Sequence, residues 1–401
     1  MAFDSSWIES LGPAQLVAKA ILISLAGILS LISFIVCRRW YRGRYFRRLN
    51  ERTLALCERW NDILSGKIPA ATWRTNSSDC KIVEGMLLDT IEMAEPQMLP
   101  ELLACLRDTG LLDLRIQEAR RYKSWRQRAA LISLGRARAP EAIPALAEAL
   151  VSSEEETRIA AVRGLGRTGL LAAAYPLLDS YVAGDLQVPE HTLKNALVHC
   201  CQNQPQALIA YMDRCSGTRR ELLARVVGEL ATPELGDDLI VLAADPLPEV
   251  RASAARALAR LDPKVAFPIL STLASDKEWF VRLRAVIALG HIQHSGKQRT
   301  LLRALGDPHR HVRIRAASVL AKMESDLPEI VDCAIAMQDS YALQALLSEL
   351  DASGALENVA NWLERSSDPS FANAALKEIT ELAKKHTGEK IKVAAAAAGG
   401  Q

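Results

Sequence analysis

The chain is poor in aromatic residues and lacks the short motifs that mark common enzyme families. Phe, Trp and Tyr make up 5% of its 401 residues, which disfavours a β-rich core and fits helices packed through alanine and leucine. A phosphate-cradling glycine loop, an HExxH motif and a GxSxG motif are all absent from the sequence. We therefore predict an all-α protein that is not an enzyme, with no catalytic residues and no cofactor.

The eight cysteines include no CxxC pair, so their spacing indicates neither a zinc motif nor a disulfide framework. Cys200 and Cys201 are adjacent, but successive side chains on a helix point about 100° apart and cannot easily chelate one ion. We expect the cysteines to be reduced and mostly buried, as free cysteines usually are. A reduced state indicates a cytosolic environment.

Four of the seven histidines fall in one short segment, at positions 291, 294, 309 and 311. The first two end one predicted helix, and the other two precede the next helix of the same kind. Parallel stacking of these helices separates the two pairs by about 18 Å, the length of twelve helical residues. We therefore expect solvated loop histidines and no metal site.

The net charge of +2 is unevenly distributed along the chain. Residues 38–48 carry six arginines and no acidic residue, which leaves a charge of −4 on the remainder. A nucleic-acid-binding array would need a basic face for the phosphates. The charge distribution therefore disfavours nucleic acid as a partner.

The most regular feature of the sequence is a pattern that recurs every 31 residues. It is clearest at 245–259, 276–290 and 307–321, where an arginine follows a valine in each copy. One column of the repeat is leucine six times in succession, at Leu146, Leu177, Leu208, Leu239, Leu270 and Leu301. Such an interval indicates a repeat architecture.

Each repeat contains two apolar-periodic segments of about ten to twelve residues, separated by a short polar turn. A helix pair this short cannot bury its apolar face alone, so stacking on neighbouring pairs must complete the core. This pattern predicts an α-solenoid. Glycines recur at the ends of the second segments and are expected to stop these helices, at Gly135, Gly166, Gly228 and Gly290.

The signature of Asp-Pro, Val-Arg, small residues and Leu-Gly in the three clearest copies resembles the HEAT-repeat family. The short interval is similar to the phycobilisome-lyase HEAT-like type, and the resemblance extends over residues 96–385. It implies a right-handed α-solenoid of about eight 31-residue HEAT-like helix pairs. It says little about function, because such scaffolds serve lyases, nucleic-acid enzymes and adaptors alike.

Acidic and basic residues form two parallel columns in the clearest copies, because an aspartate precedes each arginine by six residues. If acidic and basic residues alternate between stacked repeats, charge-assisted hydrogen bonds between them would hold the repeats in register. The arginine column alone could also bind anions. We expect the structural role for the ladder residues, which are Asp245, Arg251, Asp276, Arg282, Asp307 and Arg313.

Trp279 stands beside Phe280 at a turn in the middle of the array. We expect Phe280 to join the core. An exposed tryptophan is a common anchor of protein interfaces, whereas a buried one is only a packing residue. Trp279 is our candidate residue for a protein interface.

Residues 20–37 are eighteen successive residues without a charge. As a helix they would be about 27 Å long, close to the hydrocarbon thickness of a bilayer. A secretory signal peptide is the alternative, but the apolar stretch is too long and the positive charges follow it. We predict one transmembrane helix over this stretch.

The arginines after the apolar stretch predict its orientation, because positive residues stay on the cytoplasmic side. The N-terminus would then lie outside an inner membrane, with the solenoid in the cytoplasm of a single-pass protein. The same segment could instead contact a partner or an acidic lipid. The residues predicted to lie at the membrane interface are Arg38, Arg39, Trp40, Tyr41, Arg42, Arg44, Tyr45, Arg47 and Arg48.

These observations divide the chain into six predicted segments. They are an extracytoplasmic lead (1–19), the transmembrane helix (20–37), an Arg-rich juxtamembrane and linker helix (38–71), a hinge and irregular cap (72–95), the HEAT-like solenoid (96–385) and a flexible tail (386–401).

We predict a membrane-anchored scaffold or adaptor that binds a protein partner at the cytoplasmic face. Similarity to bacterial membrane-anchored HEAT-like proteins implies an accessory subunit of a polysaccharide-synthesis complex, with a membrane glycosyltransferase as partner. A bilin lyase or chaperone is one alternative, disfavoured by the anchor and by the lack of an evident chromophore pocket. A nucleic-acid-binding HEAT-like protein is the other, disfavoured by the acidic charge of the array.

Overall fold

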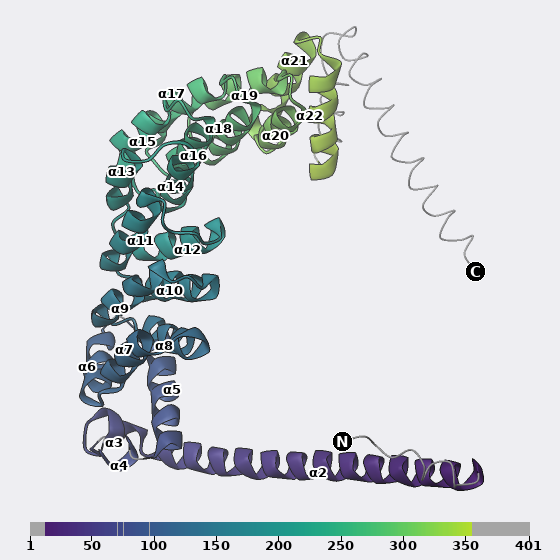
Figure 1. Cartoon of the computed structure of the whole chain (residues 1–401). Coiled ribbons are helices and arrows are strands. Elements are labelled where there is room, and N and C mark those ends of the chain that lie inside the picture. The colour runs from purple at the N-terminus through teal and green to yellow at the C-terminus, as the bar shows by residue number, and fades with distance from the viewer. Residues whose placement is uncertain (1–12, 70, 75, 96, 355–401) are drawn as a thin grey trace. The chain divides into compact units, whose positions relative to one another are not determined.

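The computed structural model describes residues 13–69, 71–74, 76–95 and 97–354. Every regular element in these ranges is a helix and none is a strand, so the predicted all-α fold is confirmed (Figure 1). Residues 355–385 of the predicted solenoid and the predicted tail lie outside the described residues. The chain divides into two compact units, residues 1–117 and 118–401.

The first unit begins with one long helix, α2 (Pro13–Glu58). This helix contains the predicted transmembrane stretch and the arginines at 38–48 without a break, and every residue from 19 to 48 is exposed. The predicted linker helix ends at Glu58, short of residue 71. From Lys19 onward α2 is long and apolar enough to cross a membrane, with a mean hydropathy of 2.7 over its most apolar window. It is the one such helix among the described residues.

Shorter helices complete the first unit, and two of them occupy the predicted hinge at residues 72–95. The helices are α3 (Trp60–Leu64), α4 (Ala71–Arg74), α5 (Ser77–Met93), α6 (Leu99–Asp108) and α7 (Leu111–Arg121), which ends beyond the unit boundary. Asn76 caps α5 by accepting a hydrogen bond from the backbone N–H of Ser78 at 2.9 Å. In the core of this unit, Arg115 Nε donates to Glu84 Oε1 at 2.6 Å.

The second unit contains helices in two layers (Figure 1). The first layer consists of α9 (Ile143–Glu148), α11 (Leu171–Ala183), α13 (Gln206–Met212), α15 (Gly236–Leu242), α17 (Pro263–Leu273), α19 (Lys297–Leu305) and α21 (Leu327–Ala336). The second layer consists of α8 (Ser124–Ala137), α10 (Glu155–Thr168), α12 (Glu190–Cys201), α14 (Gly217–Leu230), α16 (Pro248–Leu258), α18 (Trp279–His291), α20 (Arg310–Leu320) and α22 (Ser340–Ser353). Short 3₁₀ turns lie at Pro140–Ala142, Ala149–Val151, Pro233–Leu235 and Glu324–Asp326.

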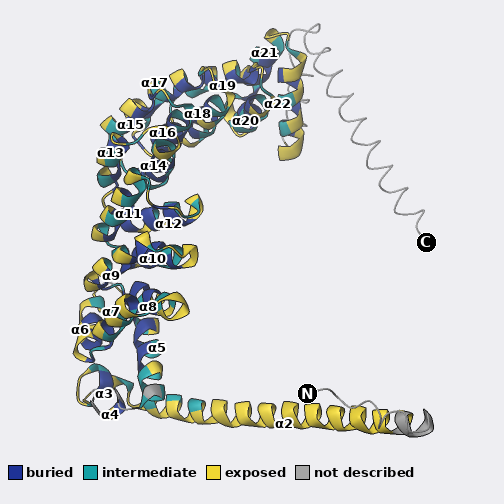
Figure 2. Cartoon of the chain, in the orientation of Figure 1, coloured by how far each residue is buried: buried dark blue, intermediate teal, exposed yellow. Residues whose placement is uncertain are grey.

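The core of the second unit lies between the two layers, as the buried residues in Figure 2 show. All six residues of the predicted leucine column are fully buried, each on a first-layer helix. A matching column from the second layer is also buried and comprises Leu134, Leu165, Ala196, Val227, Leu258, Leu289 and Leu320. Each helix pair therefore completes its core on its neighbours, as the 31-residue interval predicts.

The recurring glycines do not stop the second-layer helices, so that expectation is wrong. Gly135 and Gly166 lie inside α8 and α10, whose C-caps are Arg138 and Gly169. A Cβ on Gly135 would lie 2.6 Å from Cα of Gly164, which no side chain can tolerate. The glycines instead allow neighbouring second-layer helices to approach closely.

All eight cysteines are free, and three are buried: Cys105, Cys200 and Cys201. Burial raises the pKa of Cys200 and of Cys201 to about 12. Both thiols therefore stay protonated and unreactive near neutral pH. Cys80, Cys215 and Cys333 are half-buried, and Cys37 and Cys57 are exposed, so the expectation that most cysteines are buried is wrong.

Candidate functional site

The predicted acid and base columns form hydrogen bonds between successive repeats. Arg251 Nε and Nη2 donate to the Asp276 carboxylate at 2.7 and 2.8 Å, and Arg282 holds Asp307 in the same bidentate way at 2.6 and 2.9 Å. Each arginine also donates through Nη1 to the carbonyl of the aspartate six residues before it, at 2.9 Å. One guanidinium thus ties its own turn to the turn of the next repeat.

The ladder extends one repeat towards the N-terminus and ends at the last predicted arginine. Arg220 Nε donates to Asp245 Oδ2 at 2.8 Å, and the 31-residue register places Arg220 in the same column as Arg251. Arg313 has glutamine at the position where an aspartate would follow. It donates to the carbonyls of its own turn, and its guanidinium lies 5.4 Å from the centre of the Tyr341 ring.

The charges of the ladder neutralise one another. Burial raises the pKa of the Asp276 carboxyl, but hydrogen bonds from the Arg251 guanidinium and the Glu278 amide lower it by more. The pKa of Asp276 therefore lies below its ordinary value, and the carboxylate stays charged beside the guanidinium. Because Arg251 and Arg282 are satisfied by buried carboxylates, their geometry favours a structural role over anion binding.

Trp279, the predicted interface residue, is 38% exposed at the start of α18. Its ring stacks on His309, with the ring centres 3.9 Å apart and the planes 11° apart. His294 stacks on Phe267 in the same way, with the ring centres 3.9 Å apart. The expectation of solvated histidines is therefore wrong for His294 and His309, because each imidazole covers an aromatic face.

No group of three or more His, Cys, Asp or Glu side chains in the described ranges could hold a metal ion.

Sequence reasoning missed a tryptophan that is more exposed than Trp279. Trp125 on α8 is 66% exposed, and the guanidinium of Arg126 lies 5.5 Å from its ring. This residue belongs to a repeat whose sequence departs from the clear copies, so the repeat pattern did not draw attention to it.

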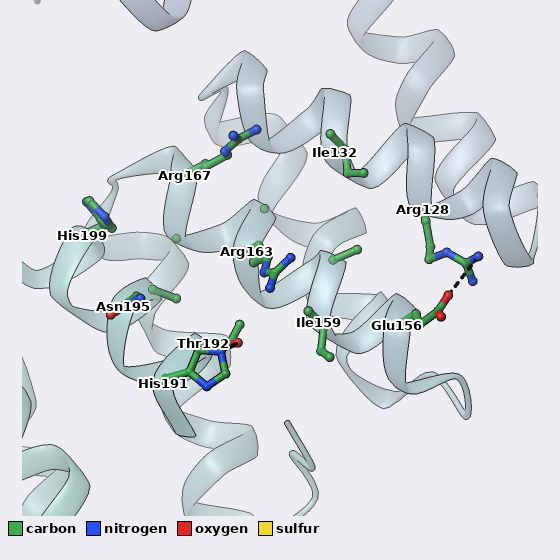
Figure 3. A pocket seen from close by; sticks show the side chains of 14 residues that line it. Arg128, Ile132, Glu156, Ile159, Arg163, Arg167, His191, Thr192, Asn195 and His199 are labelled. Carbon is green, nitrogen blue, oxygen red and sulfur yellow. Dashed lines mark hydrogen bonds and ion pairs between the residues drawn. The ribbon is translucent and has the colours of Figure 1, made fainter. Parts of the chain in front are cut away.

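A groove of about 690 Å³ lies on the second layer, over helices α8, α10 and α12 (Figure 3). Its apolar lining comes from two exposed or half-buried isoleucines, Ile132 and Ile159, and from small residues of α10 and α12. Small residues leave room there because Gly166 packs directly on Ala196. The groove is therefore a shallow apolar surface set between closely packed helices.

Basic side chains surround this apolar surface. Three arginines and two histidines line the groove against one acidic residue. That acid, Glu156, forms an ion pair with Arg128 at 3.0 Å (Figure 3). The remaining basic residues are Arg163, Arg167, His191 and His199, all exposed. The sequence reasoning did not find this groove.

The residues predicted to lie at a membrane interface are all exposed on α2, from Arg38 to Arg48. The Arg44 guanidinium lies 4.7 Å from the centre of the Trp40 ring, and Tyr45 meets Phe46 edge to face with the ring centres 5.7 Å apart. These contacts place arginine and aromatic side chains next to one another along the helix.

The paired helices, the two layers and the shared core define an α-solenoid. A comparison with protein families matches HEAT repeats at residues 112–191, 205–286 and 268–351, which together cover more than half of the chain. The chain belongs to the HEAT-repeat family. The phycobilisome-lyase type of the repeat stays a prediction. Comparison with curated proteins gives no match.

Several solved structures are similar to this chain at low sequence identity. A crystal structure of Kap121p is 16% identical, with a TM-score of 0.40, and the match covers 79% of this chain and 42% of that one. An engineered protein is 18% identical over 76% of this chain and 96% of its own, with a TM-score of 0.32. Human deoxyhypusine hydroxylase in complex with glycerol is 17% identical over 61% and 98%, with a TM-score of 0.26. This chain thus spans less than half the length of Kap121p.

Proposed function

We propose that the protein is a membrane-tethered scaffold that recruits a partner protein to the cytoplasmic face of an inner membrane. The observation that carries this proposal is the uncovered apolar surface of α2. Side chains such as Ile23 and Leu22, 73% and 64% exposed, have no protein cover in the described residues, and leaving such a surface in water would be costly. A bilayer would cover it, and the arginines that follow would stay in the cytoplasm.

The tether acts by raising the effective concentration of the solenoid near other membrane proteins. In this proposal the solenoid supplies the protein-binding surface, and Trp279 is one anchor of it, because its exposed edge is held in place by His309. We further propose that the partner is a membrane glycosyltransferase and that the protein is an accessory subunit of a polysaccharide-synthesis complex. This finer proposal rests on the similarity to bacterial membrane-anchored HEAT-like proteins.

Removing residues 1–48 is expected to abolish the recovery of a membrane partner. The full chain and the shortened chain would be extracted from native membranes in mild detergent, purified, and compared by mass spectrometry of the copurifying proteins. The proposal predicts at least one integral membrane protein with the full chain alone, and a glycosyltransferase among these would support the finer proposal. Equal recovery with both chains, or no membrane protein with either, would contradict it.

A matched control separates tethering from a specific contact made by the apolar stretch. Replacing residues 20–37 with an unrelated membrane span of equal length keeps the tether and removes the native sequence. Retention of the partner by this variant is expected, because the solenoid makes the contact. Trp279→Ala in the full chain should reduce the recovery of the partner, whereas the outward-facing Trp125→Ala should leave it unchanged if Trp279 is the anchor.

A further inference from the structure

The groove over α8, α10 and α12 departs from the charge pattern of the repeats that follow it. The exposed position of Arg163 is basic in four successive repeats: Arg163, Lys194, Arg225 and Arg256. The last three are paired across neighbouring helices, two of them with the same glutamate. Lys194 pairs with Glu229, Arg225 pairs with Glu190 at 2.8 Å, and Arg256 pairs with Glu229 at 3.6 Å.

Arg163 is the exception in this column. Among the described residues it makes no hydrogen bond or ion pair, and it is exposed at the groove. Glu229 lies 35 residues after its partner Lys194, and Glu190 lies 35 residues before its partner Arg225. For Arg163 the same two offsets fall on Val198 and Arg128. Arg128 thus stands at the offset from Arg163 where Arg225 has its partner Glu190.

The charge around the groove is therefore unbalanced towards the positive. Arg128 is engaged by Glu154 and Glu156, but no other acid lines the groove to balance Arg163. Guanidinium groups bind carboxylates with good geometry and are weakly hydrated, so they suit a protein interface. The arrangement favours an anionic ligand.

The apolar floor distinguishes a protein segment from other anions. Ile132 is 50% exposed, and Ile159 also lines the groove, on the next second-layer helix (Figure 3). A nucleic acid would need a longer basic surface for its phosphates, yet the basic residues at this position in the following repeats are paired with glutamates. An apolar side chain flanked by acidic residues would match both the floor and the rim of the groove.

We propose that this groove binds an acidic segment of the partner protein, with an apolar side chain against Ile132 and Ile159 and a carboxylate on Arg163. The proposal rests on the scaffold function above and specifies the chemistry of its partner. It also predicts that binding weakens as the salt concentration rises, because exposed charges are screened.

The test uses the purified full chain in non-ionic detergent and a fluorescent peptide in which one leucine lies between glutamates. Fluorescence anisotropy would compare this peptide with the same peptide carrying glutamine in place of glutamate. Arg163→Glu is expected to weaken binding of the acidic peptide at least tenfold, and the glutamine peptide is expected to bind at least tenfold more weakly. Equal affinity for the two peptides, or no effect of Arg163→Glu, would overturn the proposal.

Arg225→Ala is the matched control, because Arg225 occupies the same position of the repeat but is paired with Glu190. It should change the affinity for the peptide less than twofold. A single-stranded DNA of equal charge that binds more tightly than the peptide would overturn the proposal in favour of nucleic acid. Self-association that Arg163→Glu abolishes would instead assign the groove to a second copy. Because the test needs no membrane partner, its failure would leave the recovery experiment on the tether unaffected.

Discussion

Replacing Arg282 with alanine is expected to lower the free energy of unfolding by about 3 kcal/mol, the lower end for a broken buried ion pair. The Arg282 side chain is 13% exposed and that of Asp307 is 6% exposed, so the alanine variant would leave Asp307 charged and largely buried. The variant would also lose two hydrogen bonds from Arg282 to its own turn. Thermal unfolding followed by circular dichroism would show a melting temperature lower by several degrees.

Arg284→Ala is the control for this prediction, because Arg284 lies on the same helix and is exposed. It should leave the melting temperature almost unchanged. Arg282→Lys should fall between the two, because lysine keeps the charge but cannot make the bidentate contact. An Arg282→Ala variant with unchanged stability and lost partner binding would show that the arginine column serves recognition.

Replacing Gly135 with alanine is expected to destabilise the protein by about 2 kcal/mol, within the range for overpacked cores. In an ordinary helix interior the same change stabilises by about 1 kcal/mol, because alanine is the better helix former. Here the added Cβ would lie 2.6 Å from Cα and 3.1 Å from the carbonyl oxygen of Gly164. Both are backbone atoms, so α8 and α10 would have to separate.

Gly85→Ala provides a control of opposite sign. Gly85 lies inside α5, and a Cβ there would meet no atom within 4 Å. Denaturant unfolding of both variants should therefore show Gly85→Ala slightly more stable than the parent and Gly135→Ala clearly less stable. A stabilising effect at both positions would mean that α8 and α10 do not pack as closely as described.

The fold was predictable from the sequence because the 31-residue interval relates residues that are far apart in the chain. Leu146 and Leu270 lie far apart in sequence, yet the same 31-residue register shows that both face the shared core. The ladder was predictable for the same reason. Asp276 and Arg282 occupy the same positions in their repeat as the corresponding aspartates and arginines in the neighbouring repeats, so stacking aligns them in two columns. The 31-residue register also places Arg220 in the arginine column, although its repeat lacks the Val-Arg signature.

The role of the glycines could not be predicted from the sequence. A glycine near the end of a helix can serve as a C-cap or as a contact point, since both uses need the absence of a Cβ. Only the position of Gly164 beside Gly135 decides between them.

The groove could not be predicted from the sequence for a different reason. Arg225 pairs with an acid on a neighbouring helix, whereas Arg163 has no such partner among the described residues. The absence of a partner produces no sequence motif.

The most direct test of a cytoplasmic, membrane-tethered solenoid is protease accessibility of the full chain in sealed vesicles of both orientations. The segment after residue 48 is expected to be protected in right-side-out vesicles and digested in inside-out vesicles, and to stay with the membrane after alkaline carbonate extraction. Digestion of the solenoid in right-side-out vesicles, or its release by carbonate, would contradict the proposed topology.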